Sequence, residues 1–149
     1  MAPDRRVTLK SSAQIEKMAI AGALVASVLD RLATEVRPGV TTLALDAIAE
    51  EMIRGAHGVP SFIGVPGRIA PFRHTLCISI DDEIVPGIQD GQIVSVDAGA
   101  IVDGWHGDAA RTFIVGDVPD HVRRLVKTTE RAMYAGIAAA QPGAFLGAP

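Results

Sequence analysis

Hydrophobic residues in the first half of the chain recur with the spacing of amphipathic helices. Ser11 and Gln14 have the three-residue spacing of a capping box, and an apolar stripe follows them. The stripe consists of Ile15, Met18, Ala19, Val25, Val28, Leu29 and Leu32. Gly22 lies on the same face and permits close packing there. After Pro38-Gly39, which ends this helix, a second stripe predicts another helix: Leu45, Ile48, Ala49, Met52 and Ile53.

The second half of the chain changes from strand-like to helical patterns. Residues 60–73 contain three prolines and two glycines and predict a loop. Runs of β-prone residues predict strands at 75–80, 93–101 and 105–115. After Pro119-Asp120, a third helix is predicted by apolar residues at helical spacing: Val122, Leu125, Val126, Met133 and Ile137, together with Thr129. The pattern therefore predicts three helices and a small group of strands.

Two aspartates converge if the last two strands form a hairpin. Asp103-Gly104 favours a two-residue type I′ turn, which pairs Val102 with Trp105. Asp97 then lies opposite Ala110, and Asp108 becomes its diagonal neighbour on the same face. Two carboxylates so placed repel each other unless a cation lies between them, either one divalent ion or two ions roughly 3.5–4 Å apart. The alternative interpretation is a hairpin with two surface acids.

Composition limits the classes of protein to consider. At 149 residues and 48% hydrophobic content, the chain is long enough for one domain with a core. A net charge of −3 argues against a nucleic-acid partner. The single cysteine makes no internal disulfide, as expected for a reducing compartment. No run reaches the ~20 apolar residues of a membrane span, and we interpret residues 18–29 as a core helix, so we expect no membrane partner.

A longer pattern surrounds the two aspartates. Asp97-Ala98-Gly99 is followed by Asp103-Gly104-Trp105-His106-Gly107-Asp108-Ala109-Ala110-Arg111-Thr112-Phe113, and upstream stand Arg37-Pro38-Gly39-Val40-Thr41-Thr42, Pro60-Ser61-Phe62-Ile63-Gly64 and Thr75-Leu76-Cys77-Ile78-Ser79-Ile80. Together these segments closely resemble the type I methionine aminopeptidases over essentially the whole chain. The resemblance implies an α+β fold, namely half of a pita-bread fold, with an antiparallel sheet and helices packed on one face.

The resemblance also implies chemistry. It makes Asp97 and Asp108 metal ligands, and it places Cys77 in the pocket for the methionine side chain. The complete family fold holds two divalent ions, such as cobalt, manganese, iron or zinc, and removes N-terminal methionine from peptides and nascent polypeptides in the cytoplasm. A histidine and two glutamates of the second half complete the family's ligand set, and no segment of this chain matches them. We therefore expect weak metal binding here.

One position departs from the family pattern. Family members usually read Asn-Asp-Glu-Val-Val-His-Gly-Ile-Pro, with a histidine that takes part in catalysis. This chain reads Asp81-Asp82-Glu83-Ile84-Val85-Pro86-Gly87-Ile88-Gln89, so Pro86 occupies the position of the histidine. Proline has no titratable ring and no backbone donor. We therefore expect impaired catalysis and assign no catalytic residue. His106 shares a strand face with Asp108 and is a weaker candidate ligand.

Three interpretations follow. The first is a truncated or degenerate methionine aminopeptidase, with residues 1–149 as one domain corresponding to the N-terminal half of the fold. The second is a relative that binds peptide or protein without hydrolysing it, and the third is a homodimer that places two copies of the half together. Arg37-Pro38-Gly39 and Gln141-Pro142-Gly143 both follow helical patterns, which suggests a duplication whose second copy is absent. A half-fold would leave an open sheet edge, so we expect self-association.

Overall fold

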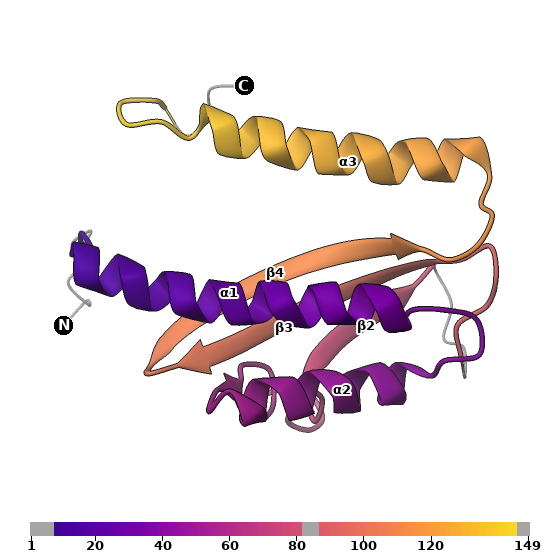
Figure 1. Ribbon diagram of the computed structural model, residues 1–149, viewed down its shortest axis with the longest axis horizontal. Helices are drawn as coiled ribbons and strands as arrows, with labels where there is room; N and C mark the ends of the chain where they lie inside the picture. Colours follow the sequence, from indigo (N-terminus) through magenta and orange to yellow (C-terminus); the bar gives the residue numbers. More distant parts are fainter. Residues whose placement is uncertain (1–7, 82–86, 146–149) are drawn as a thin grey trace.

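A computed structural model of the protein describes residues 8–81 and 87–145, and in this region the chain forms a layer of helices on a small antiparallel sheet (Figure 1). The elements are α1 (Ser12–Glu35), α2 (Thr42–Gly55), β1 (Val59–Pro60), β2 (Leu76–Ile80), β3 (Ile93–Val102), β4 (Trp105–Ile114) and α3 (Asp120–Ala139). The three predicted helices and the three predicted strands are confirmed, with small differences at their ends.

Local side-chain hydrogen bonds explain where the first two helices begin. The Ser11 hydroxyl accepts a hydrogen bond from the Gln14 backbone N–H at 3.3 Å, and the Gln14 side chain accepts one from the Ser11 N–H at 2.9 Å. This is the predicted capping box. Thr41 caps α2 in a similar way, because its hydroxyl accepts from the Ala44 N–H at 3.1 Å.

β3 is the central strand of the sheet. β4 pairs with one edge of β3 over its whole length, while β2 and then β1 pair with the other edge, and all the pairs are antiparallel. β1 lies at the start of the segment that we predicted to be a loop, so the prediction was wrong for Pro60. The strand is only two residues long and ends at a proline, which cannot donate to a ladder, so the hydrophobic pattern contains no strand signal here.

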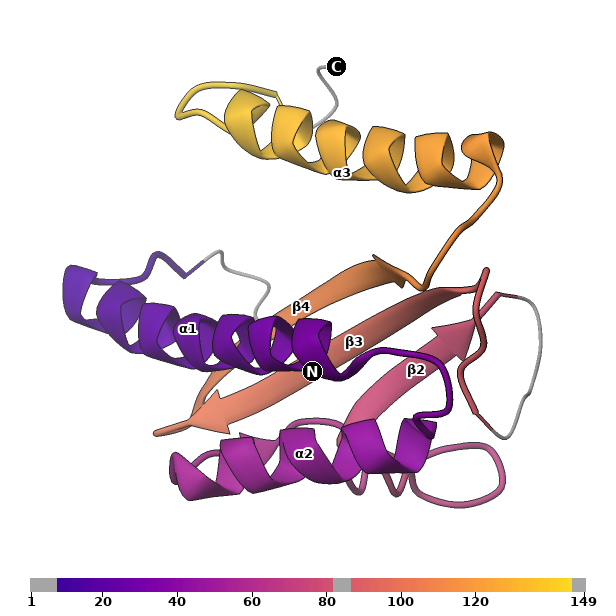
Figure 2. The same cartoon turned by 45° about the vertical axis from the view of Figure 1, so that its right-hand side comes forward.

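The two faces of the sheet differ in character. Val94, Val96, Ala98 and Ala100 of β3 are buried beneath the helices. Figure 2 shows α1 and α2 side by side on this face. α1 packs across β3 and β4, and α2 packs on β1 and β2. This face holds the core, and the expected antiparallel sheet with helices on one face is confirmed for α1 and α2.

α1 contributes to the core only from Ala21 onward. Val25, Val28, Leu29 and Leu32 are buried, as expected from the stripe. The earlier stripe residues Ile15, Met18 and Ala19 are exposed, so the prediction that they lie in the core was wrong. The reason is geometric, because the N-terminal end of α1 extends past the end of the hairpin (Figure 1). By length and composition alone α1 could cross a membrane, but its second half packs in this core.

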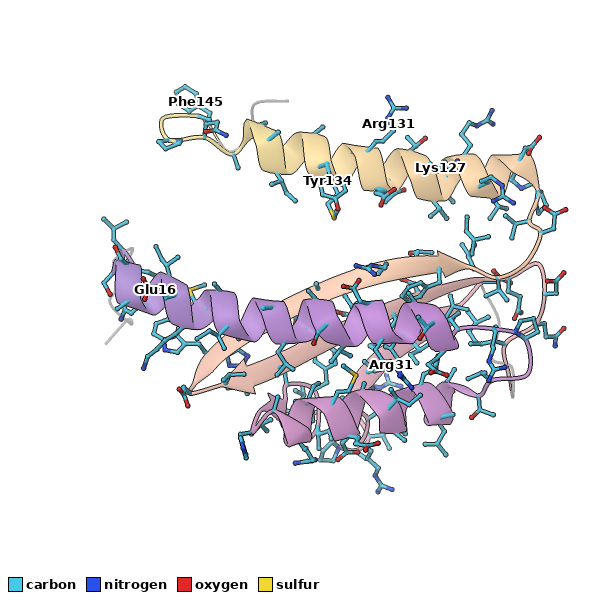
Figure 3. The ribbon with its side chains drawn as sticks, in the orientation of Figure 1. Glu16, Arg31, Lys127, Arg131, Tyr134 and Phe145 are labelled. Atoms are coloured by element: carbon cyan, nitrogen blue, oxygen red, sulfur yellow. The ribbon has the colours of Figure 1, made fainter. Side chains whose placement is uncertain are left out.

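α3 stands apart from the sheet and carries an uncovered apolar face. No residue of α3 is buried, and Leu125 and Ile137 are 60% and 61% exposed. Figure 3 shows Tyr134 on the side of α3 toward α1 and Arg131 on the opposite side. Unlike α1 and α2, α3 does not contribute to the core within the described residues.

Gly107 of β4 lets α1 approach the sheet closely. A Cβ atom at this position would overlap the backbone of Ala21 and Gly22. Gly22 was the residue expected to permit close packing, yet a Cβ there would meet nothing within 4 Å. The close approach therefore requires the glycine on the strand and not the glycine on the helix.

We predict that Gly107→Ala destabilises the protein by about 2–3 kcal/mol, because the added methyl group must displace the α1 backbone. Urea unfolding would measure the loss. Gly22→Ala is the matched control, since it adds the same methyl group into open space on a helix and should be neutral or stabilising by about 0.5–1 kcal/mol. Equal stability of Gly107→Ala and the parent chain would contradict this account of the contact.

Three strand edges have no partner in the part of the chain that the structure describes. β1, β2 and β4 each pair only with β3, so the outer edge of each is free of strand pairing. Unpaired N–H and C=O groups at an edge and an uncovered apolar helix face both favour association.

We predict that the chain self-associates at micromolar concentration, as measured by sedimentation velocity. Leu125→Glu with Ile137→Glu should reduce the association, because both charges fall on the apolar face of α3. Thr128→Glu with Ala135→Glu adds the same charge on other exposed positions of α3 and should reduce it less. A compact monomer at these concentrations would overturn the prediction.

Candidate metal site on the open face of the hairpin

The turn of the β3–β4 hairpin has the predicted conformation. Asp103 has a φ of 49° and Gly104 a φ of 79°, so both lie in the left-handed region that a type I′ turn requires. Val102 pairs with Trp105 across the turn, as expected. The register of the whole hairpin follows from this pair.

Asp97 and Asp108 lie on the same face of the hairpin, opposite the helices. Asp97 pairs with Ala110, and Asp108 pairs with Gly99, two positions further along β3. The two aspartates are therefore diagonal neighbours, as predicted. Asp97 is partly buried and Asp108 is exposed, whereas Val96 and Ala98, on the other face, are buried. The open face thus presents a pair of carboxylates.

The electrostatics of the pair favour a bound cation. Burial raises the pKa of the Asp97 carboxyl, the negative charge of Asp108 raises it further, and a hydrogen bond from the Ala98 backbone lowers it in part. The diagonal placement of the two acids in the hairpin accounts for this effect of Asp108 on Asp97. A divalent cation between them would remove this repulsion and would favour the ionised form of both groups.

Gly99 separates Asp108 from Ser61, a half-buried serine. The Ser61 N–H donates to the Gly99 carbonyl at 3.0 Å, so Ser61 continues the β1 pairing and lies beside Gly99. A Cβ on Gly99 would lie 3.1 Å from Ser61 Oγ and 3.1 Å from Asp108 Oδ2. Ser61 Oγ is buried and has no hydrogen-bond partner among the residues that the structure describes. Two carboxylates and an unpaired hydroxyl are hard oxygen groups, so the donor set fits a divalent ion.

The other sequence candidates contribute less. Cys77 lies directly opposite Asp97 on β2 and is exposed on the same open face. His106 is also exposed, near the turn, and pairs with Ile101. Pro86 lies outside the described residues. Within residues 8–81 and 87–145, no group of three or more His, Cys, Asp or Glu side chains could hold a metal ion. The aspartate pair is therefore an incomplete ligand set by itself.

A buried acid that the sequence analysis missed fixes the start of β2. Asp46 of α2 accepts a hydrogen bond from the Leu76 N–H at 2.8 Å, and its other oxygen lies 3.4 Å from His74 Nδ1. Because Leu76 pairs with Ala98, this contact sets where Cys77 falls relative to Asp97. Asp46 lies among the apolar residues of the second stripe, and nothing in the local pattern signalled its partner thirty residues away.

A hollow of about 240 Å³ borders β2 beside this contact. Its walls combine apolar side chains with the Asp46–His74 pair and Cys77: Thr42, Leu43, Asp46, Phe72, His74, Leu76, Cys77 and Ile78. The rings of Phe72 and His74 meet edge to face, with centroids 5.9 Å apart. An apolar side chain of a ligand fits the chemistry of these walls.

The fold and the sequence together place the chain in a class of enzymes. The chain belongs to metallopeptidase family M24, whose model matches residues 16–148. Its relatives include methionine aminopeptidase 1 of Mycobacterium tuberculosis, which is 42% identical over 91% of this chain, and methionine aminopeptidase A of Synechocystis, which is 43% identical over 95% of it. The resemblance inferred from the aspartate motif is thus confirmed.

Solved structures confirm the fold as half of the methionine aminopeptidase architecture. The methionine aminopeptidase of Rickettsia prowazekii superposes with a TM-score of 0.79 at 31% identity, over 89% of this chain and 54% of that one. A streptococcal methionine aminopeptidase gives a TM-score of 0.83 at 25% identity, over 91% of this chain and 61% of that one. The chain also spans only 52% and 57% of the Mycobacterium and Synechocystis proteins.

We predict that Asp97→Asn stabilises the metal-free protein at neutral pH. Burial and Asp108 raise the pKa of Asp97 in the folded chain above its ordinary value of 3.8. The stability that this proton binding contributes is present below that value and is lost as pH rises through the raised pKa of the folded state. Asparagine removes the repulsion with Asp108, so the variant should unfold at a higher temperature than the parent.

Thermal unfolding between about pH 3 and neutral pH measures this effect, because the advantage of the variant should vanish at the acid end. Glu51→Gln, which removes an exposed acid from α2, is the matched control and should follow the parent. An advantage of Asp97→Asn that is the same at every pH would contradict the explanation by charge repulsion.

Proposed function

We propose that this chain supplies the carboxylate ligands Asp97 and Asp108 of a divalent metal site for methionyl aminopeptidase chemistry. The observation that carries the proposal is the aspartate pair on one open strand face, with the repulsion between the two acids. Family membership and the methionine aminopeptidase relatives support it. Cobalt, manganese, iron and zinc remain candidate ions, since two carboxylates do not distinguish among them.

The residues of this chain have separate parts in such a site. Asp97 and Asp108 would hold the ion and neutralise its charge. Bound there, a divalent ion supplies a water molecule of lowered pKa and polarises the carbonyl group of the peptide bond to be cleaved. Cys77, opposite Asp97, is the candidate contact for substrate, and the apolar hollow beside it fits a methionine side chain. The substrate class is peptides or nascent polypeptides with N-terminal methionine, in the cytoplasm.

We further propose that catalysis by the chain alone is impaired. Two ligands from one hairpin leave most of the coordination sphere to water, because no third His, Cys, Asp or Glu joins them in the described part of the chain. The sequence has Pro86 where the family has a catalytic histidine, so a proton-transfer group is missing as well. Weak metal binding and negligible turnover follow from these two features.

The same features favour a second candidate function, that of a peptide-binding relative without hydrolysis. The hollow beside β2 and the exposed Cys77 could contact an N-terminal methionine peptide without any metal. The two functions differ in their dependence on the aspartates. Peptide binding through the hollow survives the loss of Asp97, whereas a metal site does not.

We predict that the chain binds Mn²⁺ weakly and that Asp97→Asn or Asp108→Asn each abolishes the binding. Electron paramagnetic resonance of free Mn²⁺ measures the affinity directly. Glu51→Gln, which changes the charge by the same amount on the helical layer, should bind Mn²⁺ like the parent. Equal Mn²⁺ affinity in the parent and both aspartate variants would overturn the proposed site.

With manganese or cobalt present, we expect negligible release of methionine from a Met-Ala-Ser peptide. Turnover that disappears in Asp108→Asn would show that the proposed impairment is wrong and that the chain is a competent enzyme. Peptide binding that is retained in Asp97→Asn without any turnover in the parent would favour the non-hydrolytic relative.

A further inference from the structure

Ser61, which directly follows β1, lies in one row with Gly99 of β3 and Asp108 of β4 across the open face. Gly99 pairs with Asp108 of β4 on one side, and the Ser61 N–H donates to the Gly99 carbonyl on the other side. The neighbouring row consists of Cys77, Asp97 and Ala110. Ser61 is therefore on the side of β3 opposite Asp108, with only the glycine between them.

The absence of a side chain on Gly99 lets these two groups approach each other. A Cβ there would be 3.0 Å from Ser61 Cβ and 3.1 Å from both Ser61 Oγ and Asp108 Oδ2. The hydroxyl and the carboxylate oxygen thus border the same small space above the strand, with no hydrogen bond between them in this structure. A small movement of either side chain would let Asp108 Oδ2 accept from the serine, since a carboxylate accepts and a hydroxyl donates.

The Ser61 hydroxyl is buried, and no group within residues 8–81 and 87–145 forms a hydrogen bond with it. Buried polar groups almost always have a partner, and an exception calls for an explanation such as a missing ion. Carboxylates that bind metals are themselves commonly held by hydrogen bonds from a neighbouring side chain. The unpaired Ser61 hydroxyl lies where it could donate such a hydrogen bond to the Asp108 carboxylate.

We propose that Ser61 is a positioning residue that holds the Asp108 carboxylate for the divalent ion by donating a hydrogen bond across Gly99. This inference rests on the proposed metal site and adds to it the residue that directly follows β1, outside the hairpin. Ser61 acts through Asp108 and contacts neither the substrate nor the reacting atoms.

The test compares Mn²⁺ affinity with metal-free stability in the full chain. Ser61→Ala should raise the Mn²⁺ Kd by about 10-fold to 100-fold, the usual cost of losing a group that orients a ligand. The same variant should keep or raise the metal-free melting temperature by about 2–4 °C, because it removes an unpaired buried hydroxyl. A purely structural serine would instead lower the melting temperature and leave the Kd unchanged.

Three further variants make the test specific. Ser61→Thr keeps the hydroxyl and should restore tighter Mn²⁺ binding than Ser61→Ala. Gly99→Ala places a methyl group between Ser61 and Asp108 and should weaken binding with both side chains retained. Ser95→Ala removes a hydroxyl from the same face, where it faces Thr112 at 3.4 Å, and should leave the Kd unchanged.

The aspartate variants distinguish the role of Ser61 from the metal site itself. A Ser61→Ala Kd equal to that of the parent, with binding abolished by Asp97→Asn, would overturn the role of Ser61 and leave the metal site standing. Unchanged affinity in Asp97→Asn and Asp108→Asn would instead show that the metal site itself is wrong.

Discussion

The pairing of Val102 with Trp105 across the Asp103-Gly104 turn is the constraint on which the structure depends. It sets the register of ten residue pairs, and with it the face that every side chain of β3 occupies. A slip of one residue in the register would expose the side chains of Val96 and Ala98 to solvent and would bury the side chain of Asp97 in the core. The core and the candidate site are therefore specified by the same short turn.

This register places two glycines on opposite faces of the sheet. Gly107 faces the helices and lets the backbone of α1 lie directly on β4. Gly99 faces the open side and lets Ser61 and Asp108 approach each other. In both places a missing side chain allows polar or backbone groups to come closer than any other residue would permit. The first glycine serves packing, and the second leaves space at the site.

The parts of this architecture that the sequence predicted are those encoded locally. The capping box, the helix stripes, the Asp103-Gly104 turn and the diagonal aspartates all depend on residues within one or two elements. Ser61 and Asp46 were missed because their partners lie 38 and 30 positions away, in a relation that no periodic pattern records. The exposure of Ile15 and Met18 was missed for a similar reason, since the length of the hairpin decides how much of α1 is covered.

The two faces of the sheet also differ in whether their polar and charged side chains have interaction partners. The helix face is closed by apolar packing, and even its exposed Arg111 reaches Asp30 of α1 at 2.8 Å. The open face instead combines two repelling carboxylates, an unpaired buried hydroxyl and an exposed thiol. Natural sequences that violate local rules usually do so at functional sites. The concentration of unsatisfied groups on one face, beside a fully packed one, is therefore the strongest physical reason to place the function of this chain there.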